Sequence, residues 1–198
     1  MKMNDAVIDR DIDQRRKIWK SYVPNKVEVL FIAEAPPAED RYFYYDDSSK
    51  HDHLFINLMR VLFPELTNTP ASEIRNNKPE LLKRFKQNGY LLIDAIEQRI
   101  PSNLSNRKRE KIIRSQENNL VERISKLDNN DFFAYSIKHS VFNGLSDEAK
   151  GNIGIFYNEP IPFPSNGHQK EFRELLQKAL GLRRFIWRDG DIEIVPNV

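Results

Sequence analysis

The sequence predicts a single-domain α/β protein whose parallel β-sheet carries helices on both faces. Short apolar runs of the kind found in buried strands alternate along the chain with amphipathic segments of a dozen or more residues. That alternation is typical of a parallel sheet flanked by helices. The 198 residues fit one domain spanning 1–198, since a chain of this length can bury well over half of the surface that it exposes when unfolded.

The first predicted elements are an outer helix and a central strand. Residues 5–22 place apolar side chains near one helical stripe with charges between them, and Pro24 follows. Residues 27–32 are β-branched, aromatic and almost wholly apolar. A run of this composition is expected for a strand that is covered on both faces of a parallel sheet, so we place it at the centre.

The middle of the chain continues the alternation of helix and strand. Apolar residues recur at helical spacing over 54–62, and a second helix is predicted over 79–85, with a proline in its first turn. Residues 90–96 follow a glycine and read as the second strand. A long amphipathic helix is predicted over 107–127, and a third strand over 132–141.

The last part of the chain combines a proline-rich loop with a helix and a hairpin. Residues 155–157 are apolar, whereas 159–166 hold three prolines and cannot form a central strand throughout. We therefore expect a loop that leads into a helix over 172–180. Residues 184–187 and 191–195, separated by an Asp-Gly pair, predict a terminal hairpin.

The amino-acid composition excludes several classes of protein function. Cysteine is absent, which excludes disulfides, thiol nucleophiles, thiolate metal sites and iron–sulfur clusters and suits a reducing compartment. The charged N-terminus lacks the apolar core of a signal peptide, and no apolar run approaches the ~20 residues of a membrane span. We expect a cytoplasmic protein outside the membrane. With a formal net charge of +2, the basic stretches at 106–114 and 183–188 permit nucleic-acid binding without requiring it.

The loop after the first strand is the first candidate site. Glu34 leaves the sheet, two prolines at 36 and 37 fix the path of the chain, and four successive aromatic residues occupy 42–45. These aromatics suit a rigid pocket with a flat stacking wall, and they equally suit the core and outer wall of an ordinary loop. Both interpretations stay open at this point.

The loop before the last predicted helix is the second candidate site. Ser165, Asn166 and Gly167 bring small polar groups and backbone N–H donors to a helix N-terminus, where an anion is favoured. Ser165 or Asn166 alone is also explained as a helix N-cap, and His168 as an exposed polar residue.

The charged stretch between these two loops, at residues 46–53, also contains possible metal ligands. Its possible ligands are His51 and His53 with Asp46, Asp47 or Asp52. We adopt the simpler interpretation, a charged exposed loop, and expect neither a metal nor another cofactor.

Taken together, these segments resemble the uracil-DNA glycosylase superfamily. Residues 33–37, Ala-Glu-Ala-Pro-Pro, follow an apolar strand as the family's Gly-Glu-Ala-Pro-Gly motif does. Residues 163–165, Phe-Pro-Ser, look like its His-Pro-Ser signature before a helix. Asp94, at the end of the strand 90–94, stands where the family has a base-contacting Asn.

The resemblance implies a fold and a chemistry. The fold is a three-layer α/β/α sandwich with a four-stranded parallel central sheet. The chemistry is hydrolysis of the N-glycosidic bond of a base that has been flipped out of DNA. The positions carried over are Glu34, Asp94 and His168 as catalytic residues, Tyr42, Phe43, Tyr44, Tyr45 and Phe163 as base-binding residues, and Ser165, Asn166 and Gly167 as phosphate-binding residues.

The chain departs from the family pattern at the same positions. Phe163 replaces the histidine that stabilises the leaving base and can donate no hydrogen bond, so His168 would have to replace that donor. Asp94, when ionised, only accepts hydrogen bonds and would favour a base edge with an amino group or a protonated nitrogen. Alanine replaces the first glycine of the family's first motif, and Pro37 replaces its last.

Three hypotheses follow. The first is a DNA or nucleoside glycosylase of altered base preference. The second is a catalytically inactive module of the same fold that binds nucleic acid or nucleotides. The third, an unrelated α/β hydrolase or transferase, lacks its commonest sequence signals, because the chain has no Gly-x-Ser-x-Gly motif, no phosphate-binding Gly-rich loop and no cysteine.

Overall fold

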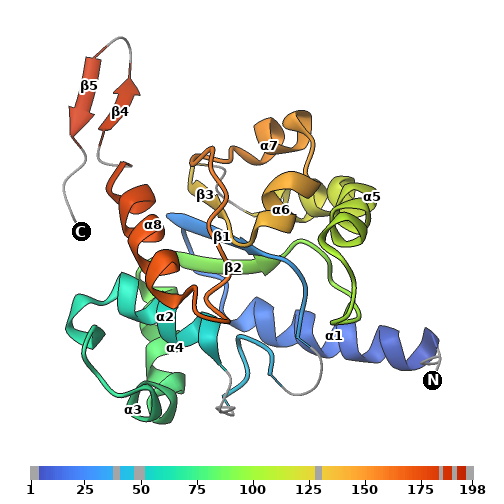
Figure 1. Cartoon of the computed structure of the whole chain (residues 1–198), viewed down its shortest axis with the longest axis horizontal. Coiled ribbons are helices and arrows are strands. Elements are labelled where there is room, and N and C mark those ends of the chain that lie inside the picture. The colour runs from blue at the N-terminus through green and yellow to red at the C-terminus, as the bar shows by residue number, and fades with distance from the viewer. Residues whose placement is uncertain are drawn as a thin grey trace.

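A parallel sheet lies at the centre of the protein, as the computed structural model shows (Figure 1). Its strands are β1 (Val29–Ala33), β2 (Tyr90–Asp94) and β3 (Phe133–Ser136). Their order is β2-β1-β3 with both pairings parallel, which confirms the central position of the first strand. The structure describes residues 5–37, 41–46, 52–127, 131–182, 185–188 and 191–194.

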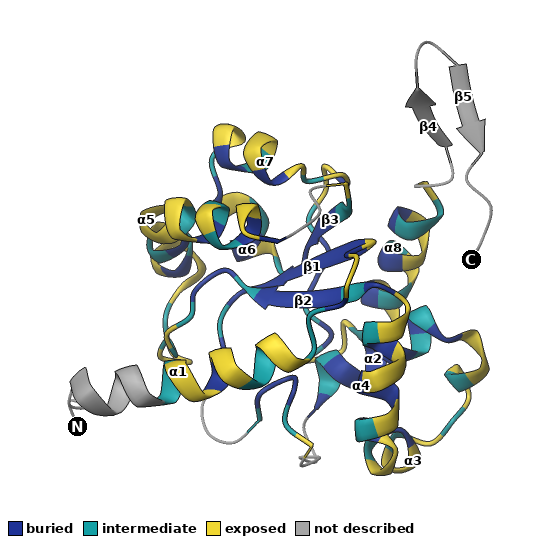
Figure 2. Ribbon diagram, turned by 180° about the vertical axis from the view of Figure 1, so that it is seen from behind, coloured by how far each residue is buried: buried dark blue, intermediate teal, exposed yellow. Residues whose placement is uncertain are grey.

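Helices cover both faces of the sheet, because its apolar side chains alternate between two cores. Phe31 contributes to one core, while Leu30 and Ile32 contribute to the other. Figure 2 shows β1 in the dark blue of buried residues between the two groups of helices. The first group is α2 (His53–Leu62), α4 (Lys78–Gln87) and α8 (Gln169–Leu182), and the second is α5 (Asn106–Ser125), α6 (His139–Gly144) and α7 (Asp147–Ile153).

The first helix, α1 (Asp5–Ser21), lies beside β2. The indole Nε1 of Trp19 donates a hydrogen bond of 3.0 Å to the carbonyl of Leu92. Arg15 donates one of 2.7 Å to the carbonyl of Glu97, just beyond β2. These bonds fix α1 against the strand.

The sheet has three strands, and the expectation of four is wrong for the described residues. Ile155 and Ile161 each make an isolated parallel bridge on the far side of β3. Between Ile155 and Ile161 the chain does not continue the ladder of hydrogen bonds with β3. Pro160 and Pro162, on either side of Ile161, have no N–H to donate. The segment therefore lies alongside β3 without forming a strand.

The third strand is shorter than predicted, since β3 ends at Ser136. The expected strand over 132–141 is wrong beyond that point, because residues 139–144 form α6. The polar stretch after α6 is itself helical: the Ser146 hydroxyl accepts a hydrogen bond from the Ala149 N–H at the start of α7. Helix α3 (Ala71–Asn76) and the 3-10 turn at Pro64–Leu66 were not predicted either.

The remaining predicted elements are present with shifted bounds. The terminal hairpin is confirmed as β4 (Phe185–Arg188) paired antiparallel with β5 (Asp191–Ile194). No helix in the described ranges has both the length and the apolar composition that a membrane crossing requires.

Candidate functional site

A cavity of about 410 Å³ opens where the strands of the sheet end, and we call it the first cavity. Glu34 directly follows β1, Asp94 ends β2, and Lys138 lies two residues beyond β3. Carboxyl ends of parallel strands are the usual ligand-binding edge of such a sheet. The lining residues that the sequence singled out are Glu34, Tyr42, Phe43, Asp94, Phe163, Ser165 and Asn166.

Glu34 is buried and held from several sides. Its Oε2 accepts a hydrogen bond of 2.7 Å from Nη1 of Arg109 and another from the ammonium of Lys138. Its Oε1 accepts one from the hydroxyl of Ser140. Because both oxygens already have strong donors, this carboxylate fixes the wall of the cavity more readily than it takes a proton from water.

Arg109 is the first site residue that the sequence analysis missed. Within the basic stretch it is buried, and its guanidinium also donates to the carbonyls of Pro101, Ser102 and Leu104. It therefore ties the loop before α5 to Glu34. Its position four residues before the buried Ile113 was a usable signal, because residues four apart share a helix face.

Lys138 is the second missed residue, and its backbone is unusual. Its φ of 86° lies where side chains other than glycine are strained. Its N–H donates a 2.6 Å hydrogen bond to the carbonyl of Ile161, while its side chain, 28% exposed, forms the ion pair with Glu34. Strained residues of this kind are concentrated at functional sites, and nothing in the sequence reveals the torsion angle.

Asp94 has a very different environment from Glu34. Burial raises the pKa of its carboxyl from the ordinary 3.8 to about 7, although Arg123 and Arg15 oppose the rise. Glu34 and Glu97 add to it by repulsion. Near neutral pH the group therefore exists in both protonation states, as a group that transfers protons should.

The four aromatic residues divide between cavity and core. Tyr42 and Phe43 line the cavity, and burial raises the pKa of the Tyr42 phenol so that it stays neutral. Tyr44 belongs to the core: its hydroxyl donates to the Leu92 carbonyl and accepts from the Leu92 N–H. Tyr45 packs edge-to-face on Tyr42, with 5.4 Å between the ring centroids. The pocket interpretation therefore holds for Tyr42 and Phe43, and the core interpretation holds for Tyr44.

The loop before α8 brings Phe163, Ser165 and Asn166 to the cavity. Asn166 and Gly167 both have positive φ, 51° and 92°, and together they turn the chain into the helix. His168 does not line the cavity, since its ring is exposed and contacts Glu171 at 2.7 Å. The structure therefore does not bring His168 to the position of the missing donor.

The charged stretch at residues 46–53 is described at Asp46, Asp52 and His53. Asp52 lines the cavity and forms a buried ion pair with Lys78, at 2.5 Å. Within the described ranges, no group of three His, Cys, Asp or Glu side chains could hold a metal ion. Asp47 and His51 lie outside the described residues.

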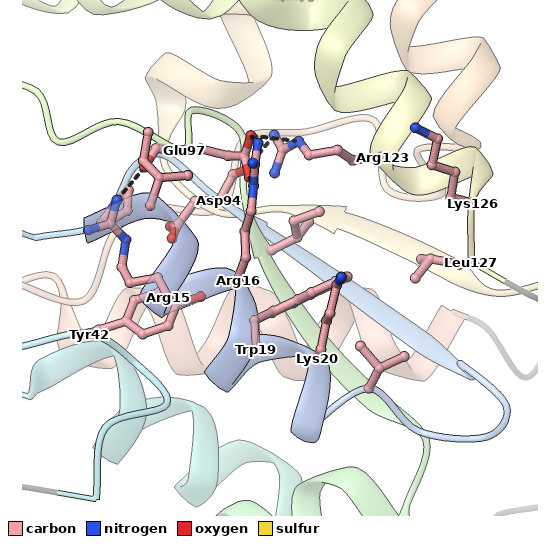
Figure 3. A pocket seen from close by; sticks show the side chains of 14 residues that line it. Arg15, Arg16, Trp19, Lys20, Tyr42, Asp94, Glu97, Arg123, Lys126 and Leu127 are labelled. Atoms are coloured by element: carbon pink, nitrogen blue, oxygen red, sulfur yellow. Dashed lines mark hydrogen bonds and ion pairs between the residues drawn. The ribbon is translucent and has the colours of Figure 1, made fainter. Parts of the chain in front are cut away.

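A second cavity, of about 510 Å³, adjoins the first. Figure 3 shows it between α1, which carries Arg16, Trp19 and Lys20, and the segment that carries Arg123, Lys126 and Leu127. Tyr42 and Asp94 line both cavities, so these two side chains form a shared wall.

Comparison with known proteins adds no relative to this picture. No protein-family model, no curated protein and no solved structure matches the chain. Function is therefore inferred from the geometry of the two cavities.

Proposed function

We propose that the chain is a divergent member of the uracil-DNA glycosylase superfamily that hydrolyses the N-glycosidic bond of a damaged or deaminated base in DNA. One observation carries the proposal. Residues that the motifs predicted from three separate segments, among them Glu34, Asp94 and Ser165, converge on the first cavity. The parallel bridges of Ile155 to Ala134 and of Ile161 to Ile137 run along the outer edge of β3, which supports the proposal without adding a fourth strand.

The roles in this reaction follow from the environment of each side chain. A flipped-out base enters the cavity between the rings of Tyr42, Phe43 and Phe163. Asp94 accepts a proton from water and stabilises the positive charge that develops on the sugar. Lys138 brings positive charge to the cavity wall where Phe163 can donate no hydrogen bond. The loop at Ser165 and Asn166 holds a flanking phosphate.

A single-turnover cleavage assay tests the proposal. Labelled duplexes and single strands carrying uracil, hypoxanthine, xanthine or an alkylated base are incubated with excess protein. We expect release of one of these bases at a rate that rises with pH through about 7, as Asp94 becomes ionised. Asp94→Asn should lower that rate by at least about a hundredfold.

The control for this assay is His168→Ala, which changes an exposed ring outside the cavity and should leave the rate unchanged. Glu34→Gln is a poor activity probe, because it leaves Arg109 and Lys138 without their carboxylate. Base release that survives Asp94→Asn at the wild-type rate would contradict the assigned role.

A second candidate function is a non-catalytic module that binds nucleic acid or nucleotides. Two observations favour it: the Phe163 side chain has no hydrogen-bond donor, and both oxygens of Glu34 already accept hydrogen bonds. In that case no base is released at high protein concentration, DNA binding is weakened by salt, and Asp94→Asn binds as well as the wild type.

A further inference from the structure

Positive side chains predominate in the lining of the second cavity. Its lining includes Arg15, Arg16, Lys20, Arg123 and Lys126 against Asp94 and Glu97. Five positive side chains and two carboxylates line it, so the lining alone carries +3, while Asp11, Asp13 and Glu122 outside the lining pair with Arg15, Arg16 and Lys126. The whole chain has a formal net charge of only +2. This concentration of positive charge favours an anionic ligand.

The cations differ in how firmly they are engaged. Arg16 holds Glu97 through two hydrogen bonds of 2.7 Å, and Arg123 approaches the same carboxylate at 3.9 Å. Lys20 makes no ion pair with any described residue, and Lys126 makes an exposed one with Glu122 of its own helix. Exposed pairs of that kind contribute little, so both ammonium groups can bind a ligand.

The remaining wall is apolar and rigid. Trp19 lines the cavity with its indole N–H already bonded to the Leu92 carbonyl, so the ring is held in place before any ligand arrives. Val23, Ile93 and Leu127 line the cavity as well. A fixed indole beside aliphatic groups suits a flat ring system, since stacking on an ordered aromatic residue costs little conformational entropy.

We propose that the second cavity binds a nucleoside phosphate, with its phosphate between Lys20 and Lys126 and its base against Trp19. Figure 3 shows the two lysines reaching the cavity from its opposite sides. A phosphomonoester carries between one and two negative charges at neutral pH. It therefore balances the charges of two lysines better than a carboxylate ligand, which carries only one negative charge. The volume of about 510 Å³ lies within the usual range of small-molecule sites.

The ligand has two sources that share a base and an anionic phosphate: a free nucleotide, whose phosphate is a monoester, and a nucleotide within a single strand, whose phosphodiester carries one negative charge. The proposal stands on the second cavity alone. Base release in the first cavity is a separate measurement, so either proposal can fail without the other.

Tryptophan fluorescence tests the site directly. The chain has two tryptophans, so Trp187→Phe leaves Trp19 as the reporter, and calorimetric titration of the wild type provides a measurement without any substitution. AMP should change the Trp19 emission saturably. The double variant Lys20→Ala/Lys126→Ala should weaken AMP binding at least about tenfold, because each lysine contributes a charge-assisted contact. Adenosine and inorganic phosphate should each bind more weakly than AMP.

The matched control is Lys17→Ala/Lys111→Ala, which removes two exposed lysines from α1 and α5 that do not line the cavity. It should bind AMP as the wild type does. Melting temperatures are recorded for both double variants, since cations near helix C-termini also stabilise helices. A lower melting temperature with unchanged AMP affinity would assign the lysines a purely structural role and overturn the proposal.

The other outcomes are equally definite. Absence of AMP binding at millimolar concentration, or equal loss in the control variant, overturns the proposal. An oligothymidylate that displaces AMP supports the site and identifies its occupant as part of a strand. AMP binding that no oligonucleotide displaces supports the site with a free nucleotide as its ligand.

Discussion

At the scale of single residues, two neighbouring carboxylates have opposite surroundings. Glu34 follows Ala33, which lies opposite Asp94 in the register of β1 and β2. Glu34 is paired with two cations and a hydroxyl, whereas the pKa of Asp94 is raised to about 7 mainly by burial. Two acids in such different environments take different roles. We assign the anchoring of the cavity wall to Glu34 and the transfer of protons to Asp94.

The strained backbone at Lys138 gives a prediction that separates its two contributions. Lys138→Gly and Lys138→Ala both remove the ammonium that pairs with Glu34, but glycine accepts a φ of 86° without strain. We expect the glycine variant to be more stable than the alanine variant by about 1–3 kcal/mol. Urea unfolding of the two variants measures the difference, and equal stabilities would show that the position carries no strain.

The sequence predicted those site residues whose place depends on strand ends. Glu34 and Asp94 follow apolar runs directly, and Phe163 and Ser165 precede a clear amphipathic helix. Lys138 and Ser140 could not be predicted as site residues, because the predicted strand over 132–141 ran past both of them. Tyr44 shows another limit, since adjacent aromatics give no sign of which ring reaches the cavity and which bonds to the backbone of β2.

At the scale of elements, the contact between α5 and α6 positions the site. A Cβ atom at Gly144 would lie 2.8 Å from the Cβ of Ile113 in α5. Lys138 immediately precedes α6, and Ser140 lies in its first turn, so the packing of this short helix sets how both side chains reach Glu34. The close approach of the two helices therefore requires a glycine.

A pair of glycine substitutions tests that requirement. Gly144→Ala should destabilise the protein by about 1–3 kcal/mol, because the added methyl group pushes α6 away from α5. Gly151→Ala in α7 should instead stabilise it by about 0.5–1 kcal/mol, since a Cβ there meets nothing within 4 Å and alanine favours the helix. Thermal unfolding measures both. A destabilising Gly151→Ala, or a neutral Gly144→Ala, would contradict the packing described.

The predicted secondary structure is wrong where tertiary contacts determine the conformation of the chain. Residues 137–141 were included in the predicted third strand, yet the chain turns at Lys138, whose N–H donates a hydrogen bond to the carbonyl of Ile161 in a distant segment. The fourth strand was expected from a resemblance, and the prolines at 160 and 162 limit it to isolated bridges. Long periodic segments such as α1 and α5 were predicted well, because their buried stripe is visible in the sequence.

At the scale of the whole molecule, the free energy of unfolding should depend on pH through Asp94. Its pKa is about 7 in the folded state and near the ordinary 3.8 when unfolded. The folded protein therefore binds more protons between these values, and its stability falls as pH rises from about 4 to about 7. The stabilising effect of the protonated group is complete below pH 4 and lost above 7.

Asp94→Asn should remove this dependence, because the amide has no charge to bury. Relative to the wild type, the variant should gain stability between pH 4 and pH 8, by up to about 4 kcal/mol if each pKa unit contributes about 1.4 kcal/mol. Denaturant titrations at both pH values give the comparison. The gain should accompany the loss of base release, and a pH dependence shared by both proteins would assign the effect to other groups.

The wall shared by the two cavities makes their ligands thermodynamically linked. Asp94 and Tyr42 face both spaces. A phosphate bound in the second cavity would repel the Asp94 carboxylate and raise its pKa further, which moves the pH for half-maximal base release upward. Linkage is reciprocal, so protonation of Asp94 must tighten the phosphate by the same factor. Lowering the pH would then strengthen phosphate binding in the second cavity and, by protonating Asp94, slow base release in the first.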